Sequence, residues 1–378
     1  MLDPVKISQE FIRCPSVTPT EAGALDILQD YLTDMGFKVH RMTFSEPGYE
    51  DVQNIYAEIG SGSPHLCLAG HLDVVPTGDE NLWSHPPFSA EIVADKLYGR
   101  GAADMKTGIA TFVSAAYEFL QNPFNGTLSF LVTMDEEGPA VNGIPKMLKW
   151  MSEHGKKPDA CLLSEPSNPD VFGELYRIGR RGTLTTHLTV NGIQGHIAYP
   201  DKTDNPITRL VNIVKELKET KLDDGNAFFP PSNLEVTGFY TDNKAENVIP
   251  SSARIMFNIR YNTEHTAKSL QEWISGIVAK YAKDYKISFN ANGDPFIAPK
   301  DSPLVKALEA GAKKILGHAP KADTGGGTSD GRFIKNLCPV AEFGIVAATN
   351  HQIDEHVLVE DIYKLHQCFV AIFKEYFA

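Results

Sequence analysis

Three consecutive carboxylates, Asp135, Glu136 and Glu137, directly follow the apolar run LSFLVTM. Two other apolar runs lead to comparable side chains, because HLCLAG is followed by His71 and ACLLSE ends in Glu165. Near-continuous apolar runs of this length are typical of strands that are buried on both faces. Taken alone, each polar residue is better explained as a surface group at a strand end, but their repetition indicates a shared chemical role.

Two further residues extend this pattern. Asp104 lies in the glycine-rich segment GRGAADMKTG before an expected helix, and His351 follows an expected strand at 340–344 after a short loop. As a single residue, Asp104 is explained equally well by a turn, and its neighbouring glycines match neither common phosphate-binding motif. The ligand site of an open α/β sheet lies beyond the carboxyl ends of its strands, so we expect these side chains to meet there.

Carboxylates gathered in one place repel one another and are costly to desolvate, and a bound cation relieves both effects. Two histidines with several carboxylates and no thiolates favour zinc or a similar divalent ion, and a bridging carboxylate permits two ions. Neighbouring strand residues point to opposite sides, so Glu136 and Glu137 cannot easily share one task. One is expected to bind metal and the other to act as a general base, and the sequence physics leaves open which.

The elements that position these residues follow a regular order. Apolar runs alternate with helix-like segments over about the first 175 residues, which predicts an α/β fold with a mostly parallel central sheet sandwiched by helices. From about residue 182 the order becomes strand, helix, strand, strand, helix, strand, as in ferredoxin-like α+β domains. The α/β pattern then resumes. We predict a discontinuous catalytic domain, 1–180 and 294–378, with a smaller domain, 181–293, inserted into it.

The composition argues against several classes of function. The chain has 378 residues, a formal net charge of −13 and no long basic run, so neither nucleic acid nor an anionic membrane is an expected partner. The five cysteines form no C-x-x-C pair, which argues against a disulfide framework or a thiolate zinc site. No apolar run resembles a signal peptide or a membrane span. These features fit a cytoplasmic protein that acts on a small molecule.

Several motifs connect these residues to a known family. The segments GHLDVVP, GRGAADMKTG, DEEG, SEPS and GHIAYP resemble those of the two-zinc, co-catalytic aminoacylase/carboxypeptidase family, and the resemblance covers almost the whole chain. Within that family, IGRRGTL, NVIPSSARIMFNIR and above all TGGGTSDGRFI resemble the branch that hydrolyses the amide of N-succinyl-LL-diaminopimelate. The resemblance therefore implies release of succinate and LL-diaminopimelate, a reaction of lysine and cell-wall synthesis.

The resemblance also implies a set of metal ligands. His71 and Glu165 would bind one ion, and His351 with Glu137 would bind the other. Asp104 would bridge both ions, and the peptide bond that follows this aspartate is cis in the family. Two divalent ions are implied, zinc in the first place and cobalt as the alternative.

Three further positions match family residues with a catalytic role. Glu136 would be the general base, and Asp73 would be the partner that orients His71. The inserted domain would form the interface of a homodimer, from which His196 would reach the active site of the other subunit and stabilise the oxyanion.

The implied substrate carries several carboxylates, and guanidinium groups bind carboxylates with paired hydrogen bonds. For each arginine the alternative is a surface salt bridge, and for the remaining positions it is a structural role. Backbone N–H groups of the glycine-rich segment GGGTSDG would hold an anion, although the same glycines also fit a turn before a helix. The positions that match substrate contacts are Arg180, Arg181, Tyr199, Asn247, Arg260, Gly327 and Thr328.

Two positions depart from the family. Met134 stands where relatives have a small residue, which we interpret as a packing change, and Ala347 stands where relatives have an asparagine near the substrate. The alternatives are another N-acyl amino-acid hydrolase, such as an acetylornithine deacetylase or a glutamate carboxypeptidase, or a non-catalytic binding scaffold. A scaffold would be expected to have lost a ligand, yet all five ligand positions and the base are present.

Overall fold

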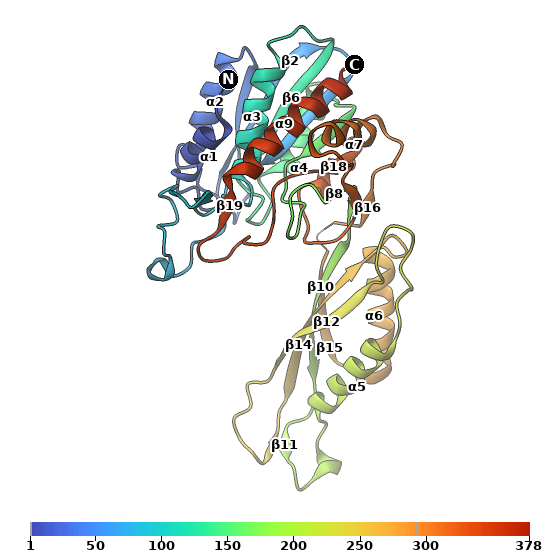
Figure 1. Cartoon of the computed structure of the whole chain (residues 1–378). Helices are drawn as coiled ribbons and strands as arrows, with labels where there is room; N and C mark the ends of the chain where they lie inside the picture. Colours follow the sequence, from blue (N-terminus) through green and yellow to red (C-terminus); the bar gives the residue numbers. More distant parts are fainter. Residues whose placement is uncertain (1, 292) are drawn as a thin grey trace. The chain divides into compact units, whose positions relative to one another are not determined.

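The computed structural model describes residues 2–291 and 293–378 (Figure 1). Positions 1 and 292, which belong to the predicted ranges 1–180 and 181–293, lie outside the described residues. Among the described helices, none is both long and apolar enough to cross a membrane.

The chain forms two compact units. The first contains the chain up to Gly179 together with Ile297–Asp323 and Ser329–Ala378. The second contains Arg180–Phe296 and Thr324–Thr328. The chain passes between the units four times: within the short strands β9 (Gly179–Arg180) and β16 (Phe296–Ile297), and at both ends of Thr324–Thr328.

An eight-stranded sheet forms the middle of the first unit. In the order in which they lie side by side, its strands are β1 (Lys38–Phe44), β2 (Val52–Ser61), β6 (Gly126–Thr133), β3 (His65–His71), β7 (Ala160–Leu163), β18 (Val340–Glu342), β8 (Leu175–Arg177) and β17 (Lys321–Asp323). The central strands β6, β3, β7 and β18 run parallel, whereas β1, β2 and the β18–β8 pair add antiparallel neighbours. This mixed, mostly parallel sheet confirms the predicted fold class.

Helices cover both faces of this sheet, which explains the continuous apolar runs. The helices are α1 (Pro4–Ile12), α2 (Ala24–Asp34), α3 (Lys106–Phe119), α4 (Ile144–Glu153), α7 (Pro303–Leu316), α8 (Gly331–Ile334) and α9 (Val359–Tyr376), with a 3-10 turn, η1, at Glu80–Leu82. Figure 1 shows α1, α3 and α9 side by side. Successive strand residues point to opposite faces. Ile55 of β2 joins the core cluster that includes Phe112 of α3, whereas the neighbouring Tyr56 ring lies 5.6 Å from Trp150 of α4.

A small antiparallel sheet holds together two loops that carry candidate ligands. Its strands, in order, are β19 (His356–Leu358), β5 (Lys96–Tyr98) and β4 (Ile92–Val93). The segment with Asp104 follows β5, and the loop with His351 precedes β19. His356 pairs with Tyr98. The start of the Asp104 segment therefore lies beside the end of the His351 loop.

The second unit has the predicted element order. Its main elements are β10 (Gly182–Asn191), α5 (Pro206–Glu219), β12 (Asn233–Tyr240), β14 (Ser252–Tyr261), α6 (Ala267–Tyr281) and β15 (Tyr285–Ala291), with smaller elements β11 (Gly195–His196), η2 (Pro200–Lys202) and β13 (Val248–Ile249). The four long strands form an antiparallel sheet in the order β12-β14-β10-β15. Residues of α5 and α6, such as Leu210 and Ile274, share a core cluster with Phe257 of β14.

The predicted inserted domain, 181–293, falls inside the second unit, but Thr324–Thr328 also belongs to that unit and lies outside the predicted range. Hydrogen bonds give the physical reason. The Arg180 guanidinium donates to the carbonyl oxygens of Gly325 and Gly327 at 3.2 and 3.1 Å. The Thr324 hydroxyl donates to the carbonyl oxygen of Phe228 at 2.5 Å.

Candidate metal centre

Three parallel strands deliver candidate ligands to one edge of the large sheet. His71 is the last residue of β3, and it is in register with Thr133, the last residue of β6. Glu136 and Glu137 follow β6, and Glu165 follows β7. Parallel strands end at the same edge, so the apolar runs place these side chains together, as the sequence predicts.

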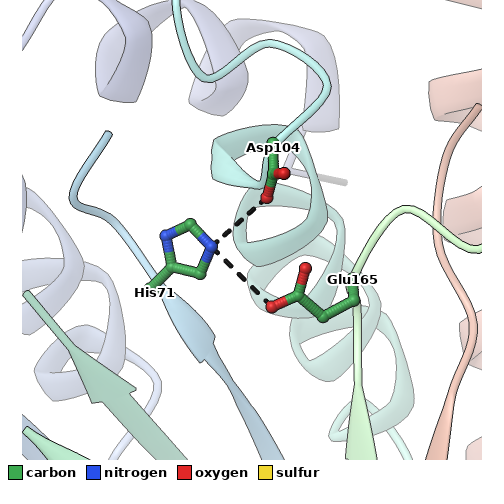
Figure 2. Close-up of side chains that lie close together, drawn as sticks. All are labelled: His71, Asp104 and Glu165. Carbon is green, nitrogen blue, oxygen red and sulfur yellow. Dashed lines mark ion pairs between the residues drawn. The ribbon is translucent and has the colours of Figure 1, made fainter. Parts of the chain in front are cut away.

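The first group of candidate ligands surrounds His71. The Nε2 atom of His71 lies 3.3 Å from Asp104 Oδ1 and 3.7 Å from Glu165 Oε1 (Figure 2). His71 and Glu165 are both buried. One ligand atom from each of the three residues lies within 4.8 Å of the other two, a spacing that could hold one metal ion.

The second group surrounds His351 and shares Asp104. The Nε2 atom of His351 lies 2.8 Å from Glu137 Oε1 and 3.5 Å from Asp104 Oδ2. Asp104 therefore turns one carboxylate oxygen toward each histidine, as a bridging ligand would. The Asn350 side-chain amide donates to Asp104 Oδ2 at 3.0 Å, and the peptide bond between Asp104 and Met105 is cis, as the family resemblance implies.

These residues fit a metal ion. The Nε2 atom of His71 is buried, and no residue in the described part of the chain gives it a well-aligned hydrogen bond, although it faces two carboxylates. An imidazole nitrogen in this position is suited to be a metal ligand. Two imidazoles and several carboxylates, without a thiolate, match zinc and similar divalent ions.

The raised pKa values of two carboxyl groups also favour a bound cation. Burial raises the pKa of Glu165 well above the ordinary glutamate value, and the charges of Asp104 and Glu136 add to this effect. Burial also raises the pKa of Glu136, to about 8, and the charge of Asp330 contributes. The protein alone thus gathers more negative charge than a buried site readily stabilises, and a divalent cation would compensate it.

Asp73 differs in detail from the sequence-based expectation. The nearest partner of His71 Nδ1 is the backbone carbonyl oxygen of Asp73, at 2.9 Å, while a carboxylate oxygen of Asp73 lies 3.5 Å away. The carboxylate instead accepts hydrogen bonds from the backbone N–H groups of Glu136 and Glu137, at 3.3 and 3.1 Å. β3 ends at His71, so Asp73 lies in the loop that follows the strand. Asp73 therefore contacts both the imidazole of His71 and the backbone of the two glutamates.

Glu136 lies close to two charged residues outside the predicted site, Arg332 and Asp330. Its Oε1 atom lies 3.4 Å from Arg332 Nη1, and its Oε2 atom lies 4.0 Å from His71 Nε2. Asp330 is buried nearby, and neither carboxylate oxygen has a hydrogen-bond partner among the described residues. The signal was available in the sequence, because both residues belong to TGGGTSDGRFI.

Asp135, which had no assigned role, shapes the turn after the strand. Its carboxylate accepts hydrogen bonds from the backbone N–H groups of Ala140 and Asn142, at 3.1 and 2.9 Å. Burial raises the pKa of Asp135, while these backbone hydrogen bonds oppose the rise. The first carboxylate of the DEEG motif therefore fixes the loop that carries the other two.

The remaining predicted residues lie in the second unit, in two groups. The first is cationic. Arg181 donates to Asn233 Oδ1 at 3.0 Å, and burial together with the nearby charge of Arg181 lowers the pKa of Arg260. Arg180, whose guanidinium donates to the carbonyl oxygen of Gly327, and Thr328 belong to the same unit.

The second group is exposed. The imidazole of His196 lies 5.8 Å from the ring of Tyr199, and its Nε2 atom lies 3.5 Å from Asn247 Nδ2. The other ring nitrogen accepts a hydrogen bond from the backbone N–H of Ala198 at 3.1 Å. The imidazole edge at Nε2 is thus presented outward beside a tyrosine and an amide.

Comparison with known proteins identifies the family. The sequence pattern of Peptidase family M20/M25/M40 matches residues 67–375. A protein from Rhodospirillum centenum, named succinyl-diaminopimelate desuccinylase, is 45% identical over 378 residues, which cover 100% of this chain and 98% of the relative. A protein of the same name from Parvibaculum lavamentivorans is 45% identical, with coverage of 100% and 96%.

Solved structures share the fold at low sequence identity. An M20-family metallo-carboxypeptidase from Sulfolobus solfataricus has a TM-score of 0.81 and 21% identity, with coverage of 100% of this chain and 99% of that one. A dinuclear metal-binding peptidase of the M20 family from Bacillus subtilis has a TM-score of 0.67 and 15% identity, with coverage of 99% and 98%. Together with the full-length relatives, these matches lead to one conclusion: the chain belongs to Peptidase family M20/M25/M40.

Proposed function

We propose that this chain hydrolyses the amide bond of N-succinyl-LL-diaminopimelate, giving succinate and LL-diaminopimelate. The relatives named succinyl-diaminopimelate desuccinylase, 45% identical over the whole chain, support the substrate. The observation that carries the reaction class is Asp104, which lies between the His71–Glu165 group and the His351–Glu137 group. The acetylornithine and glutamate carboxypeptidase alternatives have no comparable support.

The proposed cofactor is a pair of divalent ions, zinc in the first place and cobalt as the alternative. When bound, such ions polarise an amide carbonyl and lower the pKa of water to about 7. His71 and Glu165 would hold one ion, and Glu137 with His351 the other. Asp104 would contact both, because its two oxygens face the two histidines.

Glu136 is the proposed general base. It takes a proton from the attacking water, whose oxygen forms the new bond to the amide carbon. The C–N bond then breaks, and the proton passes to the nitrogen, which leaves as an amine. Arg332, 3.4 Å from the Glu136 carboxylate, would hold it in place.

The second unit would supply the contacts to the substrate. Arg180, Arg181 and Arg260 match its carboxylates, and the backbone of Gly327 and Thr328 would hold a further oxygen. We also propose that this unit forms a homodimer. His196, with Tyr199 and Asn247 beside it, would then act on the oxyanion in the partner subunit's site. The enzyme would work in the cytoplasm.

A substrate comparison tests the proposal. We expect the zinc-loaded protein to hydrolyse N-succinyl-LL-diaminopimelate with a far higher kcat/KM than N-acetylornithine or a folate-like glutamate amide. Treatment with a chelator should abolish the activity, and added Zn²⁺ should restore it. A preference for either of the other substrates would overturn the substrate assignment, and activity that persists without metal would overturn the mechanism.

A further inference from the structure

A buried ion pair joins the two loops that carry candidate ligands. Arg100 Nη1 donates to Glu355 Oε2 at 2.7 Å, and the two residues are 2% and 0% exposed. Burying two charges requires full compensation by hydrogen bonds, so the other partners of each side chain show what the pair holds.

Glu355 holds the main chain at the bridging aspartate. Its Oε1 atom accepts hydrogen bonds from the backbone N–H groups of Ala103 and Asp104, at 2.8 and 3.2 Å. The backbone carbonyl of Glu355 also accepts from the N–H of Gly99 at 2.9 Å. One residue of the His351 loop therefore fixes both ends of the Gly99–Asp104 segment.

Arg100, in turn, contacts backbone carbonyl oxygens of the His351 loop. Its Nη1 atom donates to the carbonyl oxygen of Gln352 at 3.2 Å, and its Nη2 atom lies 3.5 Å from the carbonyl oxygen of His351 and 3.3 Å from that of Pro76. The guanidinium lies 5.2 Å from the centre of the Trp83 ring. His351 has a φ of +60°, a backbone conformation that non-glycine residues rarely adopt, so its position depends on such support.

Each member of the ion pair binds the backbone of the loop that carries the other member. Arg100 stands four residues before Asp104 and binds the backbone at His351, whereas Glu355 stands four residues after His351 and binds the backbone at Asp104. His71 and Glu165, in contrast, stand at the ends of buried strands.

We propose that Arg100 and Glu355 are a positioning pair, which fixes the distance between the bridging aspartate and His351 and so sets the affinity of the second metal position. The inference rests on the proposed two-ion centre. Neither side chain touches the reacting atoms, and their effect passes through Asp104 and His351.

Two variants test the roles of Glu355 and Arg100 separately. Glu355→Gln removes the charge but keeps an oxygen that can accept from Ala103 and Asp104. Arg100→Lys keeps a cation beside Glu355 but loses the forked hydrogen bonds to the His351 loop. Arg41→Lys is the matched control, because Arg41 contacts Glu21, Asp26 and Gln53, which are remote from the ligand segments. Should Glu355→Gln fail to fold, Arg100→Lys carries the test.

Two measurements are made on the full-length chain. Metal-free protein is titrated with Zn²⁺ against a chromophoric chelator, and hydrogen exchange is followed by mass spectrometry in residues 99–106 and 349–356. We expect two Zn²⁺ ions to bind the wild type. In the pair variants, one of these ions should bind roughly 10–100-fold more weakly, the other should change less, and both segments should exchange faster. The control should behave as wild type.

The outcomes distinguish the two proposals. A wild type that binds fewer than two Zn²⁺ ions contradicts the two-ion centre, while the exchange data still decide whether the pair holds the segments. A wild type that binds two ions, with unchanged Zn²⁺ affinities and exchange rates in Arg100→Lys, overturns the positioning role.

Discussion

Two adjacent glutamates occupy different surroundings in the same turn. Glu136 faces Arg332 and His71, whereas Glu137 faces His351 at 2.8 Å. Asp73 accepts hydrogen bonds from the backbone N–H groups of both glutamates and so fixes the turn that carries them. These different partners support the proposed division of labour, with Glu137 as a metal ligand and Glu136 as the general base.

This difference predicts opposite effects of the same chemical change. Glu136→Gln should keep the metal content of the wild type while kcat falls roughly 10²–10⁴-fold, because proton transfer is lost. Glu137→Gln, its matched control, should bind less metal, because a ligand charge is removed. Elemental analysis and initial rates check both. An active Glu136→Gln variant, or an unchanged metal content in Glu137→Gln, would contradict the assignment.

The proximity of the candidate ligands could be predicted, because a carboxylate or histidine after a buried apolar run is visible in the sequence. The charged residues that support these ligands, Arg100, Glu355 and Arg332, could not be predicted. Arg100 and Glu355 are 255 residues apart, and neither stands next to an apolar run that would reveal its burial. Arg332 lies inside a recognised motif, but only the fold brings it to Glu136.

At the scale of elements, the approach of α3 to the end of β7 sets the spacing of the first ligand group. A Cβ atom at Gly108 of α3 would lie 2.5 Å from Ser164 Oγ and 2.7 Å from the Ser164 carbonyl oxygen. Ser164 precedes Glu165, and Gly108 lies four residues after Asp104. The absence of a side chain at this glycine therefore allows two ligands to come close.

Gly108→Ala should force these elements apart. We expect a loss of about 1–3 kcal/mol in the free energy of unfolding, because backbone atoms must move, together with weaker Zn²⁺ binding. Gly276→Ala in α6 is the control, since a Cβ atom there meets nothing within 4 Å and should stabilise the helix by about 0.5–1 kcal/mol. Urea unfolding and Zn²⁺ titration measure both effects. If the two variants showed the same unfolding free energy and the same Zn²⁺ affinity, the close contact at Gly108 would not be what sets the spacing of the ligands.

The elements themselves were largely predictable, because burial on both faces leaves continuous apolar strands such as β3 and β7. The return of the α/β pattern after residue 293 corresponds to elements such as α7 (Pro303–Leu316). The placement of Thr324–Thr328 was not predictable, since it depends on hydrogen bonds from Arg180, which is distant in the sequence.

At the scale of the whole molecule, the proposed homodimer makes each active site depend on two chains. His196→Ala should lose turnover without losing metal, because His196 belongs to the second unit, whereas all the candidate ligands belong to the first. Co-expression with Glu136→Gln, using two affinity tags to isolate the mixed dimer, should then restore about half of the wild-type activity, because one complete site forms per dimer. Purified single variants are the controls. A mixed dimer that is as inactive as its parents would rule out the exchange of His196 between subunits.

The candidate metal ligands are also synthesised at different times. The chain from Glu165 to His351 spans 351 − 165 = 186 residues, which include the second unit. At about 5–20 residues per second, a ribosome needs about 10 to 40 s to cross this distance. During that interval the growing chain already carries His71, Asp104 and Glu165, but not His351. All residues of the first candidate ligand group are therefore synthesised well before the second group is complete.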